Sequence, residues 1–280
     1  MSQPDFFARS APAIIAEAIE RHKPVRIYAG FSGGDDSLAL AHWMMEHVPG
    51  CELFHINTGI GVPRTREFVH DTAARYRWPL HEIRALEDCG QDYDALVRKH
   101  GFPGPFSHQF MYRNLKERAV DLLVRRSKTG WRSRVLLATG VREDESIRRM
   151  GYKGVEVVRD GAKVWASPLY WWSTEERDTY LMERQILRSP VSRALGISGE
   201  CLCGAFAQPG ELERVRACDP AVAARIDALH EEIKHRFPWG WEGRPPKVPK
   251  VRPRVGPMCQ GCEKSAVVQE ELALDREARG

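Results

Sequence analysis

The sequence predicts an α/β fold: a five-stranded, mostly parallel sheet with helices on both faces, in a Rossmann-like arrangement. Short apolar runs that are typical of buried strands alternate with segments of helical spacing. Glycine-rich or polar motifs directly follow several strands, where α/β proteins bind their ligands. Four of the seven cysteines form two close pairs beyond residue 200, which indicates a small C-terminal cysteine-bearing helical region. We therefore divide the chain into residues 1–190 and 191–280.

The composition is that of an ordinary soluble protein. The 280 residues are 42% hydrophobic and 29% charged, and the net charge of +4 decides little about partners by itself. No run of about 18 apolar residues is present that could span a membrane. The first residues lack the basic and apolar stretches of a secretory signal. We therefore expect a cytoplasmic protein without membrane contact.

The first predicted elements are a helix, a strand and a second helix. Apolar residues at helical spacing predict a helix over 11–21, which Pro24 ends. The run 25–29 is typical of a buried strand, and a helix follows over 38–47. Between strand and helix lies the stretch 31–37, which reads Phe-Ser-Gly-Gly-Asp-Asp-Ser. We call this stretch the glycine loop.

The glycine loop has the properties of a phosphate-binding turn. Gly33 and Gly34 let the backbone approach a ligand closely, because no Cβ intervenes. Free N–H groups at the helix start attract anions, and Ser32 and Ser37 add hydroxyl groups. An ordinary glycine-rich turn is the alternative. Asp35 would repel a phosphate unless its carboxylate turns away or meets a metal ion.

The middle of the chain continues the alternation of strands and helices. Strands are predicted over 51–56 and, more weakly, 80–83, with a helix that begins at Pro63 between them. A short helix over 92–99 follows. The strand 51–56 ends in a polar turn that is either a plain turn or a ligand contact, formed by Asn57, Thr58 and Gly59.

Two basic residues mark the next predicted helix. The loop 101–106 is too rich in glycine and proline to be regular, and a helix over 110–126 follows. Arg113 and Lys116 lie three positions apart and therefore share one helix face. A solvated basic face is the alternative to a phosphate contact.

The clearest buried strand, 134–140, leads into a charged segment. The strand ends in Gly140, and Arg142 and Arg149 follow it. A guanidinium suits phosphate and its charge does not titrate away. Because the segment lies at the carboxyl end of a strand, ligand contact is favoured over a surface charge run.

A hairpin and two more helices complete the predicted elements. The runs 155–158 and 163–166 flank an Asp-Gly pair, which signals a hairpin. Ser173 or Thr174 caps a helix that runs to about Leu187. A further helix is predicted over 219–236.

Five motifs, in order, resemble those of the phosphoadenosine phosphosulfate (PAPS) reductase-like family of the adenine nucleotide alpha-hydrolase, or N-type ATP pyrophosphatase, superfamily. They are Ser-Gly-Gly-x-Asp-Ser, Asn-Thr-Gly, Arg-x-x-Lys, Thr-Gly-x-Arg and Pro-Leu-x-x-Trp-Ser, and with the first cysteine pair they cover residues 25–204. The resemblance implies an ATP or PAPS site, with Mg²⁺ as a candidate companion ion. The implied nucleotide-binding residues are Ser32, Gly33, Gly34, Asp36, Ser37, Asn57, Thr58, Gly59, Arg113, Lys116, Gly140, Arg142 and Arg149.

The sequence departs from the family pattern at three of these motif positions. Asp35 stands where many nucleotide-cleaving members carry Lys, which argues against efficient ATP cleavage. Asn57 replaces an Asp, and it can hydrogen-bond but brings no charge. Arg64 replaces a Glu in the segment after the second strand.

The four paired cysteines predict one metal centre. Cys201 and Cys203 form a Cys-x-Cys, and Cys259 and Cys262 form a distant Cys-x-x-Cys. Four thiolates suit either an iron–sulfur cluster or structural zinc, and unrelated reduced cysteines are the third alternative. The family resemblance favours a 4Fe-4S cluster, because iron–sulfur sulfonucleotide reductases carry a similar set. Cys218 could replace one ligand or end a helix.

The other cysteines and the last residues complete the picture. Cys51 and Cys89 stand alone and are interpreted as buried apolar thiols. Reductases of the family end in a mobile Glu-Cys-Gly-Leu-His segment, which the end of this chain lacks. The proline-rich strip Arg244–Arg254 carries five positive charges and no acid, so it could track a nucleic-acid backbone or act as a solvated linker.

These observations lead to three functional hypotheses. The first is ATP pyrophosphatase-type activation of an acceptor, with sulfur transfer from a donor protein and nucleic acid as a candidate acceptor. The second is an iron–sulfur sulfonucleotide reductase for PAPS or its unphosphorylated relative, with a reductant protein. The third is a catalytically inactive nucleotide-binding module with structural zinc. The intact glycine loop and the missing terminal cysteine favour the first.

Overall fold

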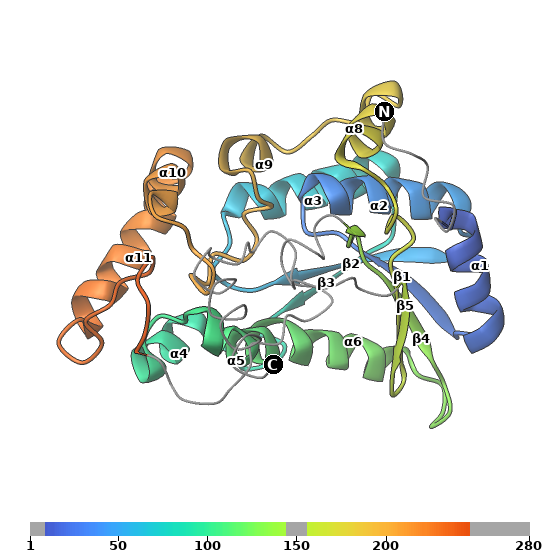
Figure 1. The fold of residues 1–280 in the computed structure, drawn as a ribbon. Coiled ribbons are helices and arrows are strands. Elements are labelled where there is room, and N and C mark those ends of the chain that lie inside the picture. The colour runs from blue at the N-terminus through green and yellow to red at the C-terminus, as the bar shows by residue number, and fades with distance from the viewer. Residues whose placement is uncertain (1–8, 144–155, 247–280) are drawn as a thin grey trace, which may run out of the picture.

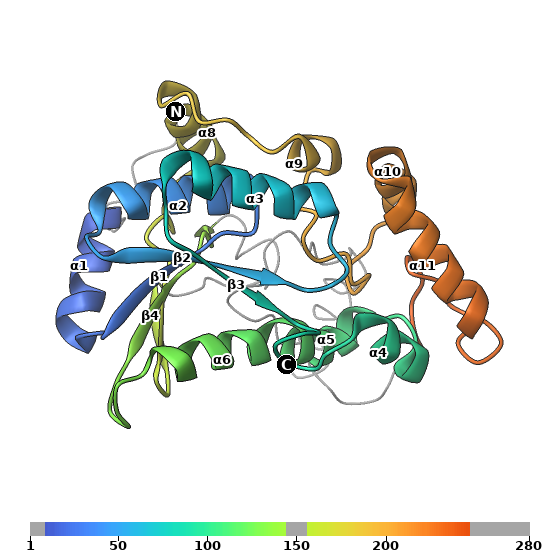
Figure 2. The same cartoon turned by 180° about the vertical axis from the view of Figure 1, so that it is seen from behind.

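A computed structural model describes residues 9–143 and 156–246. The described residues form one six-stranded sheet, ordered β3-β2-β1-β4-β6-β5 (Figures 1 and 2). Every neighbouring pair is parallel except β5 with β6, at one edge. The strands are β1 (Arg26–Gly30), β2 (Cys51–Asn57), β3 (Leu80–Arg84), β4 (Val135–Ala138), β5 (Val157–Asp160) and β6 (Lys163–Ala166).

The predicted α/β fold is confirmed, but the predicted number of five strands is wrong. Both arms of the expected hairpin join the sheet, because β6 pairs in parallel with β4 and β5 then pairs with β6. The register of β5 with β6 runs from Val157 opposite Ala166 to Asp160 opposite Lys163. The first arm therefore begins two residues later than the sequence suggested, and Gly161, at φ +58°, makes the turn.

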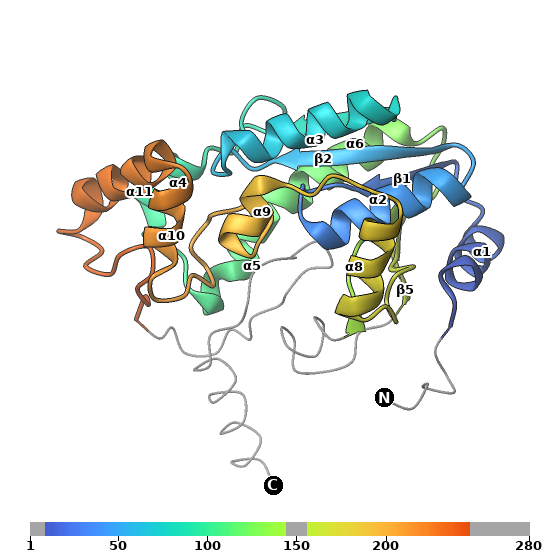
Figure 3. The same cartoon turned by 90° about the horizontal axis from the view of Figure 1, so that it is seen from above.

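Helices cover both faces of the sheet. Helices α1, α2 and α3 lie on one face, and α6, continued by α4 and α5, lies on the other (Figures 1, 2 and 3). The first half of the chain supplies α1 (Ala11–His22), α2 (Asp35–His47), α3 (Pro63–Tyr76), α4 (Tyr93–His100), α5 (His108–Tyr112) and α6 (Arg118–Ser127).

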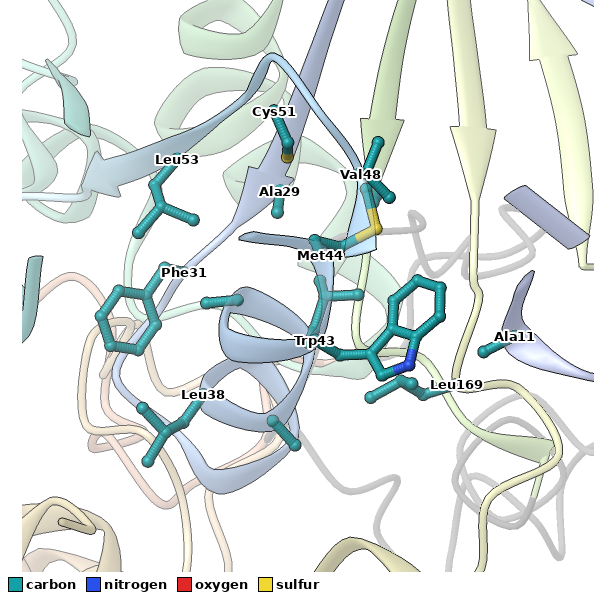
Figure 4. Packing of buried hydrophobic residues seen from close by; sticks show 14 of the residues in the cluster. Ala11, Ala29, Phe31, Leu38, Trp43, Met44, Val48, Cys51, Leu53 and Leu169 are labelled. Atoms are coloured by element: carbon teal, nitrogen blue, oxygen red, sulfur yellow. The ribbon is translucent and has the colours of Figure 1, made fainter. Parts of the chain in front are cut away.

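Helix α2, which directly follows the glycine loop, is deeply buried. Leu38, Met44 and Trp43 are at most 5% exposed and pack among apolar residues of the sheet (Figure 4). Full burial of such side chains contributes roughly 1.5–3 kcal/mol each. The glycine loop, which precedes α2, is therefore fixed to a rigid element.

The helix predicted over 110–126 is continuous but not regular. A π-helical turn, Arg113–Glu117, joins α5 to α6, and a short 3₁₀ turn, Pro105–Ser107, precedes α5. Single π-helical turns inside α-helices are frequent at functional sites. Here the turn carries both of the basic residues that the sequence singled out.

The C-terminal half of the described chain contains two helices that the sequence did not predict, α9 (Pro190–Leu195) and α10 (Glu211–Cys218). Helix α8 (Thr174–Glu183) begins with a capping box between Ser173 and Glu176 and ends earlier than expected. Helix α11 (Pro220–Ile233) is capped by the Asp219 side chain. None of the helices in the described ranges combines the length and the apolar character needed to cross a bilayer.

A second apolar cluster joins these C-terminal helices to the rest of the chain. It contains Tyr93 of α4, Met111 of α5, Val191 of α9 and Ile226 of α11, and it includes Trp241. The cluster therefore draws residues from both sides of the predicted boundary at residue 190. It surrounds the segment that carries the first cysteine pair.

Candidate functional site

The two glycines of the glycine loop are required by its geometry. Gly33 has φ +82°, and a Cβ there would lie 2.8 Å from the Thr65 methyl carbon. Gly34 is extended at the start of α2, and a Cβ there would lie 3.1 Å from the Ser198 Cβ. The loop can therefore adopt this shape only with small residues, and its backbone lies against both α3 and the segment near residue 198.

The two serines of the loop bond to one another. The Ser37 hydroxyl donates to the Gly34 carbonyl at 2.8 Å, and it accepts from the Ser32 amide at 3.2 Å and the Ser32 hydroxyl at 3.1 Å. Ser37 is 3% exposed. Its hydroxyl therefore closes the turn, which sets the positions of the amide groups around it.

The first acidic residue of α2 is turned away from the pocket. Asp35 forms an ion pair with Arg188, whose guanidinium also lies 3.3 Å from Asp178. This pairing neutralises the charge that, from the sequence, would repel a phosphate. The structure thus supplies the first of the two conditions stated for Asp35, namely that it turns away.

Asp36, in the first turn of α2, accepts hydrogen bonds from two guanidinium groups. Its Oδ1 accepts hydrogen bonds of 2.8 Å from Arg142 Nε and from Arg177 Nη1. Arg142 is 3% exposed and also donates to the Trp172 carbonyl at 3.2 Å. Asp36 and Arg142, which were both predicted site residues, are therefore part of a buried network that fixes the start of α2.

Gly140 allows the chain after β4 to pack on the first turn of α2. A Cβ there would lie 2.8 Å from the Asp36 carbonyl oxygen and 3.1 Å from the Ser37 amide nitrogen. Since backbone atoms cannot yield as a flexible side chain can, a larger residue would displace the glycine loop. Gly140 thus supports the loop by close packing.

The second predicted motif contacts the segment Gly199–Gly204, which we call the cysteine segment. Thr58 is fully buried; its amide donates to Glu200 Oε1 at 3.0 Å and its hydroxyl to the Glu200 carbonyl at 2.6 Å. Asn57 accepts from the Gly59 amide at 3.0 Å and donates to Glu82 at 2.9 Å. The motif therefore binds the cysteine segment to the end of β2.

A buried histidine completes this contact. His55 of β2 donates through Nδ1 to the Phe31 carbonyl at 2.8 Å, and its Nε2 lies 3.3 Å from Glu200 Oε2. Burial acts to lower the pKa of His55, but the Glu200 carboxylate outweighs it, and the pKa lies above its usual value. Because the carbonyl can only accept, Nδ1 carries a hydrogen, and Nε2 is the ring nitrogen that faces the Glu200 carboxylate.

The pocket brings the glycine loop, the strand ends and the cysteine segment together. Lys116 reaches it from the π-helical turn, whereas Arg113 is exposed and lies 3.8 Å from Glu117. Arg149 lies outside the described residues. The lining residues are Gly30, Phe31, Ser32, Ser37, Phe54, Ile56, Lys116, Thr139, Ser198 and Glu200.

Sequence reasoning did not identify Glu200 and Ser198, which line this pocket, or His55, which lies against Glu200. The only sequence signal for His55 is that it is a polar residue inside an apolar strand. The only signal for Glu200 is that it directly precedes Cys201. Ser198 gave no signal, since an isolated serine in a loop has no distinctive pattern. The partners of His55 and Glu200 lie in distant parts of the sequence, so their pairing required the fold.

Two of the four predicted metal ligands lie in the described chain, on the cysteine segment. Cys203 is 2% exposed and Cys201 is half-buried. Tyr93 Oη donates to the Cys203 carbonyl at 3.2 Å, and Trp241 Nε1 donates to the Leu202 carbonyl at 2.8 Å. These anchors fix the backbone that presents the two thiols.

The other predicted ligands, Cys259 and Cys262, lie outside the described residues. Within residues 9–143 and 156–246, no group of three or more ligand side chains is assembled for a metal ion. The donor set on the cysteine segment therefore fits half of a four-thiolate centre. A complete centre needs two more thiolates from beyond residue 246.

The remaining cysteines differ from this pair. Burial raises the pKa of Cys51 to about 12, which keeps its thiol protonated, and burial also raises the pKa of the partly buried Cys89. Cys218 ends α10, as one of the two interpretations of the sequence proposed. Metal ligands must be thiolates, so these environments suit apolar or helix-end thiols.

Comparisons with known proteins can now be set beside this geometry. The family model described as phosphoadenosine phosphosulfate reductase domain matches residues 26–194. No curated protein matches the chain significantly. Similar solved structures include PAPS reductase from Candida auris in a phosphate complex, with 17% identity, a TM-score of 0.50, and coverage of 70% of this chain and 94% of that chain.

Two further solved structures match more of the chain at lower structural similarity. One is the U34-tRNA thiolase NcsA from Methanococcus maripaludis with its [4Fe-4S] cluster, with 15% identity, a TM-score of 0.40, and coverage of 92% and 86%. The other is the NH3-dependent NAD synthetase from Campylobacter jejuni, with 15% identity, a TM-score of 0.43, and coverage of 87% and 100%.

Proposed function

The chain belongs to the phosphoadenosine phosphosulfate reductase domain family, and on this basis we propose that it is an adenine-nucleotide-dependent enzyme that activates an acceptor with ATP for sulfur transfer. One observation carries the proposal. Glu200, which adjoins Cys201, lines the same pocket as Ser32 and Ser37 of the glycine loop. Nucleotide activation and thiol chemistry would therefore take place at neighbouring positions.

The described residues suit the binding of an anionic nucleotide. The amides at the start of α2 and the shape of the glycine loop favour phosphate. Lys116 adds a positive charge in the pocket, and the Asp35 carboxylate is neutralised by Arg188. The apolar side chains of Phe54 and Ile56 line the same pocket and would contact the base or ribose.

The proposed reaction has two steps that balance without an external oxidant or reductant. An oxygen atom of the acceptor attacks the α-phosphorus of ATP, the bond to the bridging oxygen breaks, and pyrophosphate leaves. A hydrosulfide ion, released by a donor protein, then attacks the activated acceptor carbon; the carbon–oxygen bond breaks, and AMP leaves with the acceptor oxygen. The glycine loop would hold the leaving pyrophosphate during the first step.

A cysteine-bound cofactor would lie beside this pocket. Cys201 and Cys203 would hold it together with Cys259 and Cys262, as a 4Fe-4S cluster or, alternatively, as structural zinc. A cluster, when bound, would supply iron–sulfur chemistry beside the pocket, whereas zinc would only hold the tail. The described chain's part is to fix the two thiols through Tyr93 and Trp241.

Product analysis distinguishes this proposal from its main alternative, a sulfonucleotide reductase. The protein, purified without oxygen, is incubated separately with ATP and with PAPS, and binding is measured by calorimetry. We expect tighter binding of ATP, release of pyrophosphate once an acceptor such as cellular RNA or DNA is added, and release of AMP once sulfide is added as well. Preferred binding of PAPS, with release of sulfite in the presence of a thiol reductant, would overturn the proposal.

Metal analysis tests the cysteine ligand set separately. In the anaerobic protein we expect iron and sulfide rather than zinc, and Cys201→Ser or Cys259→Ser should each remove most of the metal. Cys89→Ser is the matched control and should retain it. Full metal content in Cys259→Ser, together with loss in Cys218→Ser, would show that the ligand set is wrong.

A further inference from the structure

A basic edge of the sheet lies opposite the pocket. Residues 118–134, which form α6 and the loop after it, contain six arginines or lysines and one acidic residue. The loop leads into the amino end of β4, whereas the pocket lies at the carboxyl ends of the parallel strands. In Figure 1 the loop after α6 projects below β4, away from α9 and α10.

The tip of this loop presents a tryptophan to solvent. Trp131 is 80% exposed, and the Arg132 guanidinium lies 4.4 Å from the centre of its ring. The Ser133 hydroxyl accepts from the amides of Thr129 and Gly130 at 3.2 and 2.9 Å, and the Ser133 amide donates back to Gly130 at 3.1 Å. A closed turn therefore holds a large apolar ring outward, beside the Arg132 guanidinium.

Uncompensated positive charge surrounds the tryptophan. Arg125, Lys128 and Arg132 have no carboxylate partner among the residues that the structure describes. Arg21 and Arg159 approach the same edge with Arg134, and after burial these three arginines lower the pKa of His22.

Two other basic side chains of the region are already paired. Arg126 lies 3.2 Å from Asp88, and Lys163 lies 2.9 Å from Asp121 and 3.0 Å from Asp160. These two therefore add little to the charge of the edge, and its net charge comes from the side chains without acidic partners.

We propose that this edge, formed by Arg125, Lys128, Trp131, Arg132 and Arg134, binds a single-stranded polynucleotide. The guanidinium and ammonium groups match a phosphate backbone, and the exposed indole offers a face on which an unpaired base can stack. A duplex keeps its bases stacked inside and gives the indole no such partner. An acidic peptide meets the charges but supplies no planar group for the ring.

Fluorescence anisotropy with labelled oligo(U) and oligo(dT) tests this surface on the full-length protein. Trp131→Ala should raise the Kd about fivefold to a hundredfold, which corresponds to one stacked base, while Trp131→Phe should keep most of the affinity. Lys128→Gln should lower the slope of log K against log salt by about 0.7. Lys99→Gln, on α4 at the opposite end of the molecule, should change neither the affinity nor the slope.

Three results would overturn the inference: no binding by the wild-type protein, unchanged affinity in Trp131→Ala, or displacement of the oligonucleotide by polyglutamate as efficiently as by unlabelled oligonucleotide. The two oligonucleotides show whether RNA or DNA is preferred. The surface is separate from the pocket, so a Gly34→Val variant should keep oligonucleotide binding even where nucleotide binding is lost.

Discussion

The glycine loop and the cysteine segment meet at one pocket, but they are held in place in different ways. The hydrogen bonds that close the turn of the glycine loop join Ser32, Gly34 and Ser37, which are at most five positions apart. Asp35 and Asp36 of the loop then pair with distant arginines. The hydrogen bonds that hold the cysteine segment join residues far apart, with Glu200 and Thr58 separated by 142 positions and Tyr93 and Cys203 by 110. The turn of the glycine loop is therefore encoded locally, whereas the position of the cysteine segment depends on the completed fold.

This difference explains how the two regions should respond to substitution. Changes in the glycine loop alter a turn between β1 and α2. These two elements remain buried in the first apolar cluster, which contains Ala29, Leu38 and Met44. Changes in the cysteine segment remove contacts that join β2, α4 and the C-terminal helices. We therefore expect substitutions in the cysteine segment to affect stability most and substitutions in the glycine loop to affect ligand binding most.

The largest effect is expected for Glu200→Ala. The substitution leaves the buried His55 ring and the Thr58 amide without their partner, which costs about 3–5 kcal/mol of unfolding free energy. Urea denaturation measures this loss, and limited proteolysis between residues 199 and 204 reports local loosening. Glu213→Ala, at an exposed acid, is the control; if Glu200→Ala lost under 1 kcal/mol, distant contacts would not be what holds the segment.

How much of each region the sequence predicts follows from the same contrast. Two glycines and two serines within six residues, between an apolar run and a helix, were sufficient to predict the glycine loop. The buried pair of His55 and Glu200 was not predictable, because neither residue lies in a pattern that names the other. Burial of Glu200 beside a histidine arises only when the cysteine segment folds back onto β2.

The prediction of helices and strands was limited in the same way, by contacts between distant parts of the chain. Strong apolar runs predicted the parallel strands, while α9 and α10 were missed because they are short and their apolar residues face a cluster drawn from distant segments. The sheet gained a sixth strand because both arms of the predicted hairpin join it, and β5, whose side chains are mostly exposed, forms its edge. Arg142 was predicted as a nucleotide contact, and its pairing with Asp36, beside Trp172 and Arg177, could not be predicted from the sequence.

An intermediate effect is expected for substitutions in the glycine loop. Gly34→Val places a side chain against Ser198 at the pocket, and we expect the Kd for ATP to rise at least tenfold, or about 1.4 kcal/mol. Ser37→Ala removes the hydroxyl that closes the turn and should weaken ATP binding by roughly fivefold, given about 1 kcal/mol for a hydrogen bond. Calorimetry measures both.

Ser127→Ala provides the matched control for Ser37→Ala. The Ser127 hydroxyl forms two hydrogen bonds within the fold, with the Leu123 carbonyl at 2.7 Å and with Tyr28 Oη at 3.0 Å, but it lies at the end of α6. It should lower stability to a similar degree and leave the ATP affinity unchanged. Equal loss of affinity in both variants would mean that the Ser37 effect is general and that the loop has no special role.

The smallest effect concerns acid sensitivity on the glycine-loop side of the molecule. Burial lowers the pKa of His42 on α2, whose Nδ1 lies 2.9 Å from Tyr180 Oη. The unfolded chain therefore binds a proton at this residue more readily than the folded chain as the pH falls through about 6.5. Stability at this site is full above that pH and decreases below it, so urea midpoints at pH 7.5 and pH 5.5 should differ less in His42→Gln than in wild type. An unchanged difference would show that protonation of His42 does not cause the loss of stability, and that acid acts through other groups.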